Sequence, residues 1–144
     1  MENIRTLTKF MGGKSVVGSP RSEHDFIKII RLGLPSTAFK CVVNASEISE
    51  DVIYDCLPIA KRTVARCIEK SSRFKPATSE LLYRLSRVLV TAQDVLGDKD
   101  HAKQWLLSQN TALGGQRPIE LLDTGIGFED VMDVLRRIEY GVYS

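Results

Sequence analysis

The sequence of 144 residues lacks several features that would place it in well-known classes of protein. It contains no stretch close to the roughly 20 consecutive apolar residues that a membrane-spanning helix needs. Residues 1–23 contain no apolar segment of the kind found in secretory signal peptides. We therefore expect a cytoplasmic protein that does not interact with a membrane.

Cysteine and histidine are scarce, and their spacing argues against a metal site. The three cysteines are Cys41, Cys56 and Cys67, an odd number with no C-x-x-C pair, and His24 and His101 are isolated from them. We expect the cysteines to be reduced and to serve as small, mostly buried apolar residues.

The usual signatures of catalysis and nucleotide binding are also missing. The sequence shows no Ser/His/Asp or Cys/His set, and no glycine-rich phosphate loop followed by a lysine. The glycine-rich stretch at residues 113–118, LGGQRP, lacks that context, and we interpret it as a turn that needs positive φ. The sequence therefore predicts a protein that is not an enzyme and needs no cofactor.

Apolar residues recur with the period of an α-helix through most of the chain, whereas the alternation typical of β-strands is absent. This pattern predicts an all-α fold, a bundle of seven or eight short helices. The clearest helix covers residues 79–96 and ends at Gly97. Ser49 and Asp98 are suited to cap the helices that follow them, because their side chains can accept a hydrogen bond from the first turn.

The two ends of the chain are less regular. Pro118 is expected to open a short helix, because proline is favoured at the first helical position. Gly125 and Gly127 are expected to end it, and the last helix is expected at about residues 128–139. Residues 1–20 are rich in glycine, serine and lysine, so we expect a flexible N-terminal arm there.

Charges of opposite sign are concentrated in different parts of the chain, although the net charge is only +2. Residues 61–75 carry six basic residues and one acidic residue, a net charge of +5. Residues 118–144 carry six acidic residues and two basic ones, a net charge of −4. The first segment attracts phosphate groups and the second repels them. This asymmetry indicates two partners rather than one.

The basic segment has the pattern of a helix-turn-helix, in which a tight turn joins two short helices. Pro58 ends the first helix, and a second helical pattern begins only two or three residues later. Lys61, Arg62 and Thr63 lie at the N-terminal end of the second helix, the end that enters the major groove. Arg66 follows one turn later, and an arginine there can contact guanine with two hydrogen bonds that contribute about 1–3 kcal/mol to base discrimination.

Further basic residues are suited to contact phosphates, which set the affinity for DNA rather than the choice of sequence. The candidate DNA-binding residues are Lys61, Arg62, Thr63, Arg66, Lys70 and Arg73. A basic helix face that is only solvated by water would have the same composition, and the charges alone do not separate the two interpretations.

Two stretches resemble a known family. Residues 50–71, EDVIYDCLPIAKRTVARCIEKS, are similar to the Xre-type helix-turn-helix, with Pro58 and Ala60 in place of the usual glycine and the common capping serine or threonine. Residues 112–144 more specifically resemble the C-terminal domain of the Xre/MbcA/ParS family of antitoxins, and the whole resemblance covers about residues 25–144. The matching positions in that domain are Leu113, Gly114, Gly115, Pro118, Leu121, Leu122, Thr124, Gly127, Ile138, Glu139, Tyr140, Gly141, Val142 and Tyr143.

The resemblance implies a bacterial antitoxin of a RES-Xre type II toxin–antitoxin system. Such antitoxins are typically encoded beside a RES-domain toxin, which consumes NAD⁺ or transfers ADP-ribose from it. The resemblance further implies that the antitoxin obstructs the NAD⁺ site of its toxin, and that the complex binds operator DNA and represses its own operon. Because helix-turn-helix proteins usually read two half-sites, we expect a homodimer.

The closing residues would supply the obstruction. Tyr140 and Tyr143 flank Gly141 and Val142, and tyrosine offers a large, rigid contact surface whose hydroxyl can be paired when buried. Acidic residues of the preceding helix would pair with arginines of a dinucleotide pocket. The candidate toxin-binding residues are Arg136, Arg137, Glu139, Tyr140, Val142, Tyr143 and Ser144. Alternatively, both tyrosines fold back onto the core of this chain.

We expect three regions: a flexible N-terminal arm at residues 1–20, a helix-turn-helix DNA-binding region at residues 21–76, and a small helical toxin-binding domain with its tail at residues 77–144. A second function fits the same pattern. The protein would then be a stand-alone helix-turn-helix transcriptional regulator whose C-terminal domain only dimerises.

Overall fold

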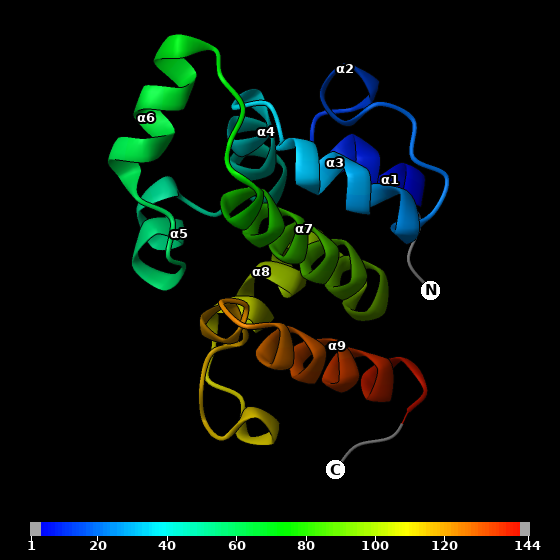
Figure 1. Ribbon diagram of the computed structural model, residues 1–144. Coiled ribbons are helices and arrows are strands. Elements are labelled where there is room, and N and C mark those ends of the chain that lie inside the picture. Colours follow the sequence, from blue (N-terminus) through cyan, green and yellow to red (C-terminus); the bar gives the residue numbers. More distant parts are fainter. Residues whose placement is uncertain (1–3, 142–144) are drawn as a thin grey trace.

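The computed structural model describes residues 4–141, and the regular elements in this range are helices, which confirms the expected all-α fold (Figure 1). The α-helices of the described range are α1 (Ile4–Phe10), α2 (Lys14–Val17), α3 (Phe26–Leu32), α4 (Thr37–Ser46), α5 (Glu50–Cys56), α6 (Lys61–Lys70), α7 (Pro76–Leu96), α8 (Lys99–Leu107) and α9 (Gly125–Glu139). The short 3₁₀ helices are η1 (Glu23–Asp25), η2 (Thr111–Leu113) and η3 (Pro118–Leu121). None of the helices in residues 4–141 is long and apolar enough to cross a membrane.

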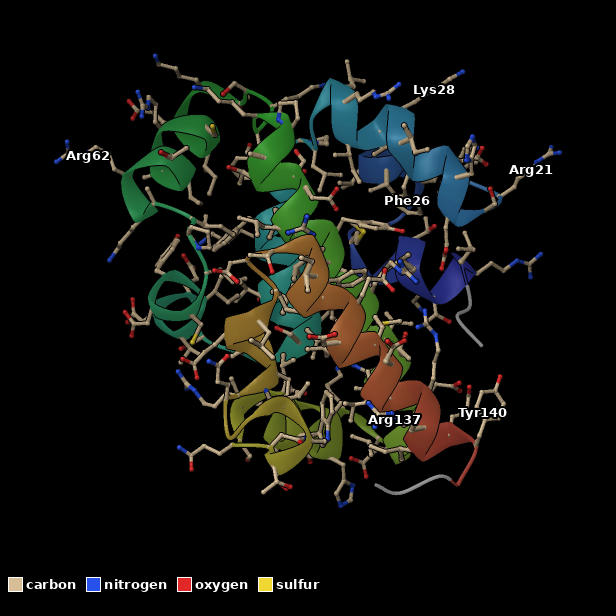
Figure 2. All side chains as sticks on the ribbon, turned by 60° about the horizontal axis from the view of Figure 1, so that its bottom comes forward. Arg21, Phe26, Lys28, Arg62, Arg137 and Tyr140 are labelled. Carbon is tan, nitrogen blue, oxygen red and sulfur yellow. The ribbon has the colours of Figure 1, made fainter. Side chains whose placement is uncertain are left out.

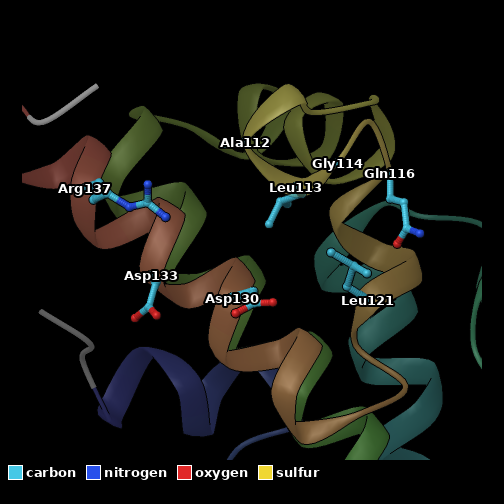
Figure 3. Close-up of a pocket in the computed structure, with 8 residues that line it drawn as sticks. All are labelled: Ala112, Leu113, Gly114, Gln116, Leu121, Asp130, Asp133 and Arg137. Carbon is cyan, nitrogen blue, oxygen red and sulfur yellow. The ribbon is translucent and has the colours of Figure 1, made fainter. Parts of the chain in front are cut away.

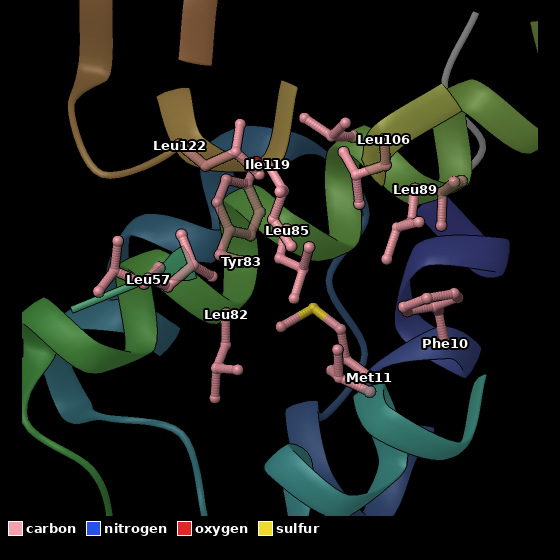
Figure 4. Packing of buried hydrophobic residues seen from close by; sticks show 14 of the residues in the cluster. Phe10, Met11, Leu57, Leu82, Tyr83, Leu85, Leu89, Leu106, Ile119 and Leu122 are labelled. Carbon is pink, nitrogen blue, oxygen red and sulfur yellow. The ribbon is translucent and has the colours of Figure 1, made fainter. Parts of the chain in front are cut away.

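The longest helix, α7, forms the centre of the bundle, and α1, α3, α4, α8 and α9 pack around it (Figure 1). It begins at Pro76, three residues before the expected start, because proline at the first helical position loses no hydrogen bond. Its buried side chains lie on all faces, as expected for a helix surrounded by others. Figure 4 shows Leu82, Leu85 and Leu89 of α7 in this core, together with Leu106 of α8.

The N-terminal segment differs from the expected flexible arm. Residues 4–17 form α1 and α2, and Leu7, Met11 and Val17 are at most 4% exposed. Leu7, Phe10 and Met11 are spaced i, i+3 and i+4, so they share one face of α1, which packs on α7 and α4. The glycines and lysines that indicated an arm instead occupy the turns and the surface of this small hairpin.

The start of α9 corrects another expectation. Gly125 is the first residue of this helix and Gly127 lies inside it, so neither glycine ends a helix. The Thr124 hydroxyl accepts a hydrogen bond from the Gly127 N–H at 3.0 Å, which caps the helix. A Cβ at position 127 would lie 2.0 Å from the Leu121 carbonyl oxygen. Glycine is therefore needed because the backbones of α9 and η3 approach each other closely.

Two expected helix caps are confirmed. The Ser49 side chain accepts a hydrogen bond from the Val52 N–H at 3.3 Å at the start of α5. The Asp98 carboxylate accepts one from the His101 N–H at 2.8 Å at the start of α8. Both caps satisfy N–H groups that have no partner within the helix.

Candidate DNA-binding and toxin-binding surfaces

The turn between α5 and α6 consists of residues 57–60. Leu57 has an extended backbone, with φ −120° and ψ 148°, as the residue before a proline requires. Leu57 and Ile59 are 3% and 4% exposed, so both anchor the turn in the core. Packing therefore holds this turn, although Ala60 gives α6 no side-chain cap.

Helix α6 is attached to the molecule along one narrow face. Val64 is its fully buried side chain, and Thr63 is half-buried. Figure 2 shows Arg62 projecting away from the rest of the molecule. The exposed candidates on this helix are Lys61, Arg62, Arg66 and Lys70. The structure thus brings these cations together on a solvent-facing surface.

Arg73 makes a structural contact that the sequence did not indicate. Its Nη1 donates a hydrogen bond to the Gly33 carbonyl oxygen at 2.7 Å, and Arg73 and Pro35 form an isolated antiparallel bridge. The Phe74 N–H donates to the Leu34 carbonyl oxygen at 2.9 Å. These contacts fasten the segment after α6 to the segment between α3 and α4. Arg73 therefore positions α6 in addition to carrying charge.

Glu50, in the first turn of α5, connects this helix to α4. The Lys40 Nζ donates a hydrogen bond to one carboxylate oxygen at 2.6 Å, and the Tyr54 hydroxyl donates to the other at 3.2 Å. The hydrogen bond from Lys40 holds the pKa of Glu50 below its usual value, and the charge of Lys61 acts in the same direction. Burial, followed by the charge of Glu50, raises the pKa of Tyr54 to about 12.

The last turn of α9 presents four of the candidate toxin-binding side chains to solvent. These residues are Arg136, Arg137, Glu139 and Tyr140. The Tyr140 side chain is 76% exposed, and Figure 2 shows it with Arg137 at the C-terminal end of α9. Tyr140 therefore does not pack onto the core of this chain. The remaining candidates, Val142, Tyr143 and Ser144, lie outside the described residues.

A pocket of about 400 Å³ lies between α9 and the loop at residues 112–116 (Figure 3). The α9 side carries the charged residues Asp130, Asp133 and Arg137. Leu113 and Leu121 supply apolar walls. The pocket therefore combines apolar walls with two carboxylates and one guanidinium group.

The loop beside this pocket contains the expected turn with positive φ. Gly114 and Gly115 have φ values of 68° and 82°. After the loop, the Arg117 Nε donates a hydrogen bond to Glu120 at 2.8 Å, and its Nη2 donates to the Cys56 Sγ at 3.3 Å. The Cys56 contact joins this region to the end of α5. Burial raises the pKa of the Cys56 thiol, and the charge of Arg117 partly offsets that effect.

Comparison with known proteins identifies the family. Residues 91–141 match the family described as "Antitoxin Xre/MbcA/ParS C-terminal toxin-binding domain". The chain is 34% identical over 130 residues to an "Antitoxin Xre" from Photorhabdus laumondii, and the alignment covers 89% of this chain and 88% of that relative. The chain belongs to the Xre/MbcA/ParS family of antitoxins.

Two further relatives agree with this assignment. An "Antitoxin Xre" from Yersinia enterocolitica is 30% identical to the antitoxin over 130 residues, which cover 89% of this chain and 88% of that relative. A "Prs ADP-ribosylating antitoxin" from Sphingobium sp. is 28% identical over 129 residues, which cover 83% of this chain and 81% of that relative. These alignments extend well beyond the C-terminal domain, so the relationship concerns most of the antitoxin.

The toxin-binding domain of the antitoxin contains the end of α7, followed by α8, η2, η3 and α9. It therefore includes the pocket of Figure 3 and the exposed residues at the end of α9. At the opposite end of the same helix, Ile126 is 80% exposed. Sequence reasoning overlooked Ile126, because the two glycines beside it were interpreted as helix breakers rather than as part of a helix.

Arg87 was also overlooked, since it lies within the apolar pattern of α7. Its Nη2 pairs with the Glu23 carboxylate at 2.7 Å. Its guanidinium lies 5.2 Å from the centroid of the Phe128 ring and 5.7 Å from that of Tyr83. Arg87 thus connects α7 with η1 and α9, and supports the helix that carries the toxin-binding candidates.

Proposed function

We propose that the antitoxin neutralises a cognate RES-domain toxin, which consumes NAD⁺ or transfers ADP-ribose from it, by placing residues 140–144 in the NAD⁺ site of that toxin. The observation that carries this proposal is the position of Tyr140, whose side chain is 76% exposed at the end of the toxin-binding domain. An aromatic side chain that already lies outside the core can enter a pocket of the partner without unfolding the antitoxin.

Residues 140–144 would act as a plug, which requires no catalytic reaction by the antitoxin. The segment only has to occupy the space and the phosphate-binding groups that NAD⁺ would use. The carboxylates of Asp130 and Glu139 would pair with cationic groups of the toxin, and Arg136 and Arg137 would contact the rim of its pocket. Gly141, with φ of 74°, allows the backbone to turn away from α9.

Deletion of residues 140–144 tests this plug. Tyr140 and Gly141 are exposed, so the shortened antitoxin should keep its helical circular dichroism and its thermal midpoint. It should lose neutralisation in cells that express the toxin gene adjacent to its own, and in an NAD⁺-consumption assay with that purified toxin.

The Leu32→Ala variant is a control, because it removes an exposed apolar side chain from α3, outside the toxin-binding match at residues 91–141. It should neutralise the toxin as the wild type does. Full neutralisation by the shortened protein, or an equal loss in the control, would contradict the plug.

We further propose that α5 and α6 form a DNA-binding helix-turn-helix, and that a homodimer of the antitoxin binds operator DNA and represses its own operon. The exposed cationic surface of α6 supports this proposal. Lys61, Arg62, Thr63 and Arg66 would face the major groove, and Lys70 and Arg73 would contact phosphates. On this proposal the protein is cytoplasmic, the DNA-binding region covers residues 21–76, and the toxin-binding domain, which contains nearly all of α7, covers residues 77–144. Helices α3 and α4 of the first region pack on α7.

A stand-alone transcriptional regulator, whose C-terminal domain only dimerises, is the second candidate. The same exposed surface of α6 favours it. The two functions differ in the deletion experiment: a regulator without a toxin would show no change in any toxicity assay, and its affinity for operator DNA would stay the same.

A further inference from the structure

A groove of about 690 Å³ lies between η1 and the C-terminal part of α9, beside the start of α1. Four residues that share one face of α9 and its cap line one side of it: Met132, Arg136, Glu139 and Tyr140. The smaller pocket of Figure 3 is lined by a different face of α9. Residues 21–24 line the other side of this η1–α9 groove.

The η1–α9 groove is continuous with the toxin-binding surface. Three of the four exposed toxin-binding candidates at the end of α9 line it, namely Arg136, Glu139 and Tyr140. Residues 91–141 match the toxin-binding domain, whereas residues 21–24 lie outside that match. Figure 2 shows Arg21 and Tyr140 at the same edge of the molecule. A toxin that contacts the end of α9 therefore lies directly beside residues 21–24.

The η1 side of the groove is already ordered in the free antitoxin. The Glu23 carboxylate pairs with the Arg87 guanidinium of α7 at 2.7 Å. The Asp25 carboxylate accepts a hydrogen bond from the Arg21 N–H at 2.7 Å, which fixes the turn before η1. Phe26, directly after η1, is buried in the core. A surface that is ordered beforehand lowers the entropy lost when a partner binds.

The lining of the groove has the composition of a protein–protein interface. Ile4, which is half-buried, the buried Met132 and the exposed Tyr140 supply apolar and aromatic surface. Charged groups of both signs accompany them, among them Arg21 and Glu139. Protein interfaces combine apolar and aromatic residues with a polar rim in the same way, whereas a site for a small anion would concentrate basic groups.

A stable interface also needs more surface than the end of the chain provides. Each partner of a specific protein–protein complex contributes about 800 Å² and about 20–30 residues. The toxin-binding candidates are only seven residues, all within residues 136–144. Neighbouring surface must therefore contribute, and the η1–α9 groove is a concave surface that three of these candidates already line.

We propose that the η1–α9 groove binds a segment of the cognate toxin, so that the toxin-binding surface extends from α9 to residues 21–24. The toxin segment places an apolar side chain against Ile4 and Met132, and its polar groups contact Arg21 at the edge of the groove. This proposal rests on toxin binding by the antitoxin, and it does not depend on residues 140–144 entering the NAD⁺ site.

Filling the groove with a bulky side chain tests the proposal. Ser22 is exposed and its hydroxyl does not cap η1, so Ser22→Trp should leave the helical circular dichroism and the thermal midpoint unchanged. In isothermal titration calorimetry with the full-length antitoxin and its purified toxin, the dissociation constant should rise by about tenfold or more, because the indole occupies the space of the toxin segment. The control Lys28→Trp places the same side chain on an exposed position of α3 outside the groove, and it should bind the toxin as the wild type does.

Photo-crosslinking decides the question if Ser22→Trp lowers the thermal midpoint. A photoreactive phenylalanine derivative at position 22 should form a covalent adduct with the toxin, whereas the same residue at position 28 should not. No adduct from position 22 would then overturn the proposal.

A folded Ser22→Trp protein that binds the toxin as tightly as the wild type, or more tightly, also overturns the proposal. If its toxin affinity is unchanged while the sedimentation coefficient of the free antitoxin changes, the groove is assigned to a second copy of this chain instead. Failure of the plug has a different signature. The antitoxin without residues 140–144 would then still neutralise the toxin, while the effect of Ser22→Trp on toxin affinity would remain.

Discussion

Replacing Gly127 by alanine should destabilise the antitoxin, although alanine in a helix interior is normally better than glycine by about 1 kcal/mol. The reason is the contact between α9 and η3. The added Cβ would lie 2.0 Å from the carbonyl oxygen of Leu121 and 2.9 Å from its carbonyl carbon. A carbon atom normally approaches a carbonyl oxygen to about 3.3 Å. One of the two backbones would therefore have to move by roughly 1 Å.

The size of the effect follows from two opposing contributions. Overpacking of a close-packed site costs about 1–3 kcal/mol, and a backbone neighbour that cannot rotate away places this case near the upper limit. The gain in helix propensity offsets about 1 kcal/mol. The net loss is therefore about 2 kcal/mol, which lowers the melting temperature of a chain of this size by roughly 4–8 °C.

Gly125 provides the matched control, since it lies two residues earlier in the same helix. A Cβ at Gly125 would have Arg84 Nη2 as its nearest neighbour, at 3.9 Å, so there is no clash. Gly125→Ala should be neutral or stabilising by up to about 1 kcal/mol. Urea unfolding followed by far-ultraviolet circular dichroism measures both variants. Equal urea midpoints for the two alanine variants would refute the argument that a side chain at position 127 clashes with the Leu121 backbone.

Three further outcomes are expected. Replacing Arg62 and Arg66 with alanine should weaken binding to the antitoxin's own promoter by roughly 30-fold or more in fluorescence anisotropy, because each of the two base contacts contributes about 1–3 kcal/mol. Toxin inhibition should stay nearly intact, and an equal loss of inhibition would mean that the two surfaces are not separate. Ser79→Ala should lower the free energy of unfolding by about 1–3 kcal/mol, because the buried Leu34 N–H loses the hydroxyl that accepts its hydrogen bond at 2.8 Å; no change in the urea midpoint would contradict this. The phenol of Tyr54 should ionise about two pH units later than an ordinary tyrosine, since its pKa is raised from 10.0 to about 12. Because the raised pKa favours the neutral phenol of the folded state, this stabilisation is fully present below pH 10 and is lost as the pH rises towards 12. In a pH titration followed by tyrosinate absorbance, the wild type should therefore show an ionisation step near pH 12 that is missing in Tyr54→Phe.

Local sequence signals were sufficient for the class of fold and for the C-terminal ends of α7 and α9. The caps at Ser49 and Asp98 act within a single helical turn, so they could be identified without knowing the rest of the structure. The concentration of basic residues at 61–75 could likewise be read directly. The family resemblance pointed to the C-terminal toxin-binding domain on the motif residues alone.

The prediction of a flexible N-terminal arm was wrong for a physical reason. Glycine, serine and lysine account for seven of residues 1–20 and apolar side chains for another seven, but folding depends on where the apolar residues lie. Leu7, Phe10 and Met11 form one short apolar stripe, which is stable only because α7 and α4 are present to cover it. A segment of this length carries no signal that its covering partner exists elsewhere in the chain.

The same distinction between local and long-range information applies to the candidate DNA-binding and toxin-binding surfaces. Apart from residues 4–17 and the first turn of α9, the sequence by itself determined which segments are helical and which are charged, because these properties depend on neighbours within one or two turns. Only the tertiary structure decided that Tyr140 stays outside the core, that Gly127 supports a close contact and that Arg117 reaches Cys56 across 61 residues of sequence. Each of these roles depends on how distant parts of the chain pack against one another, and that packing leaves no local pattern in the sequence.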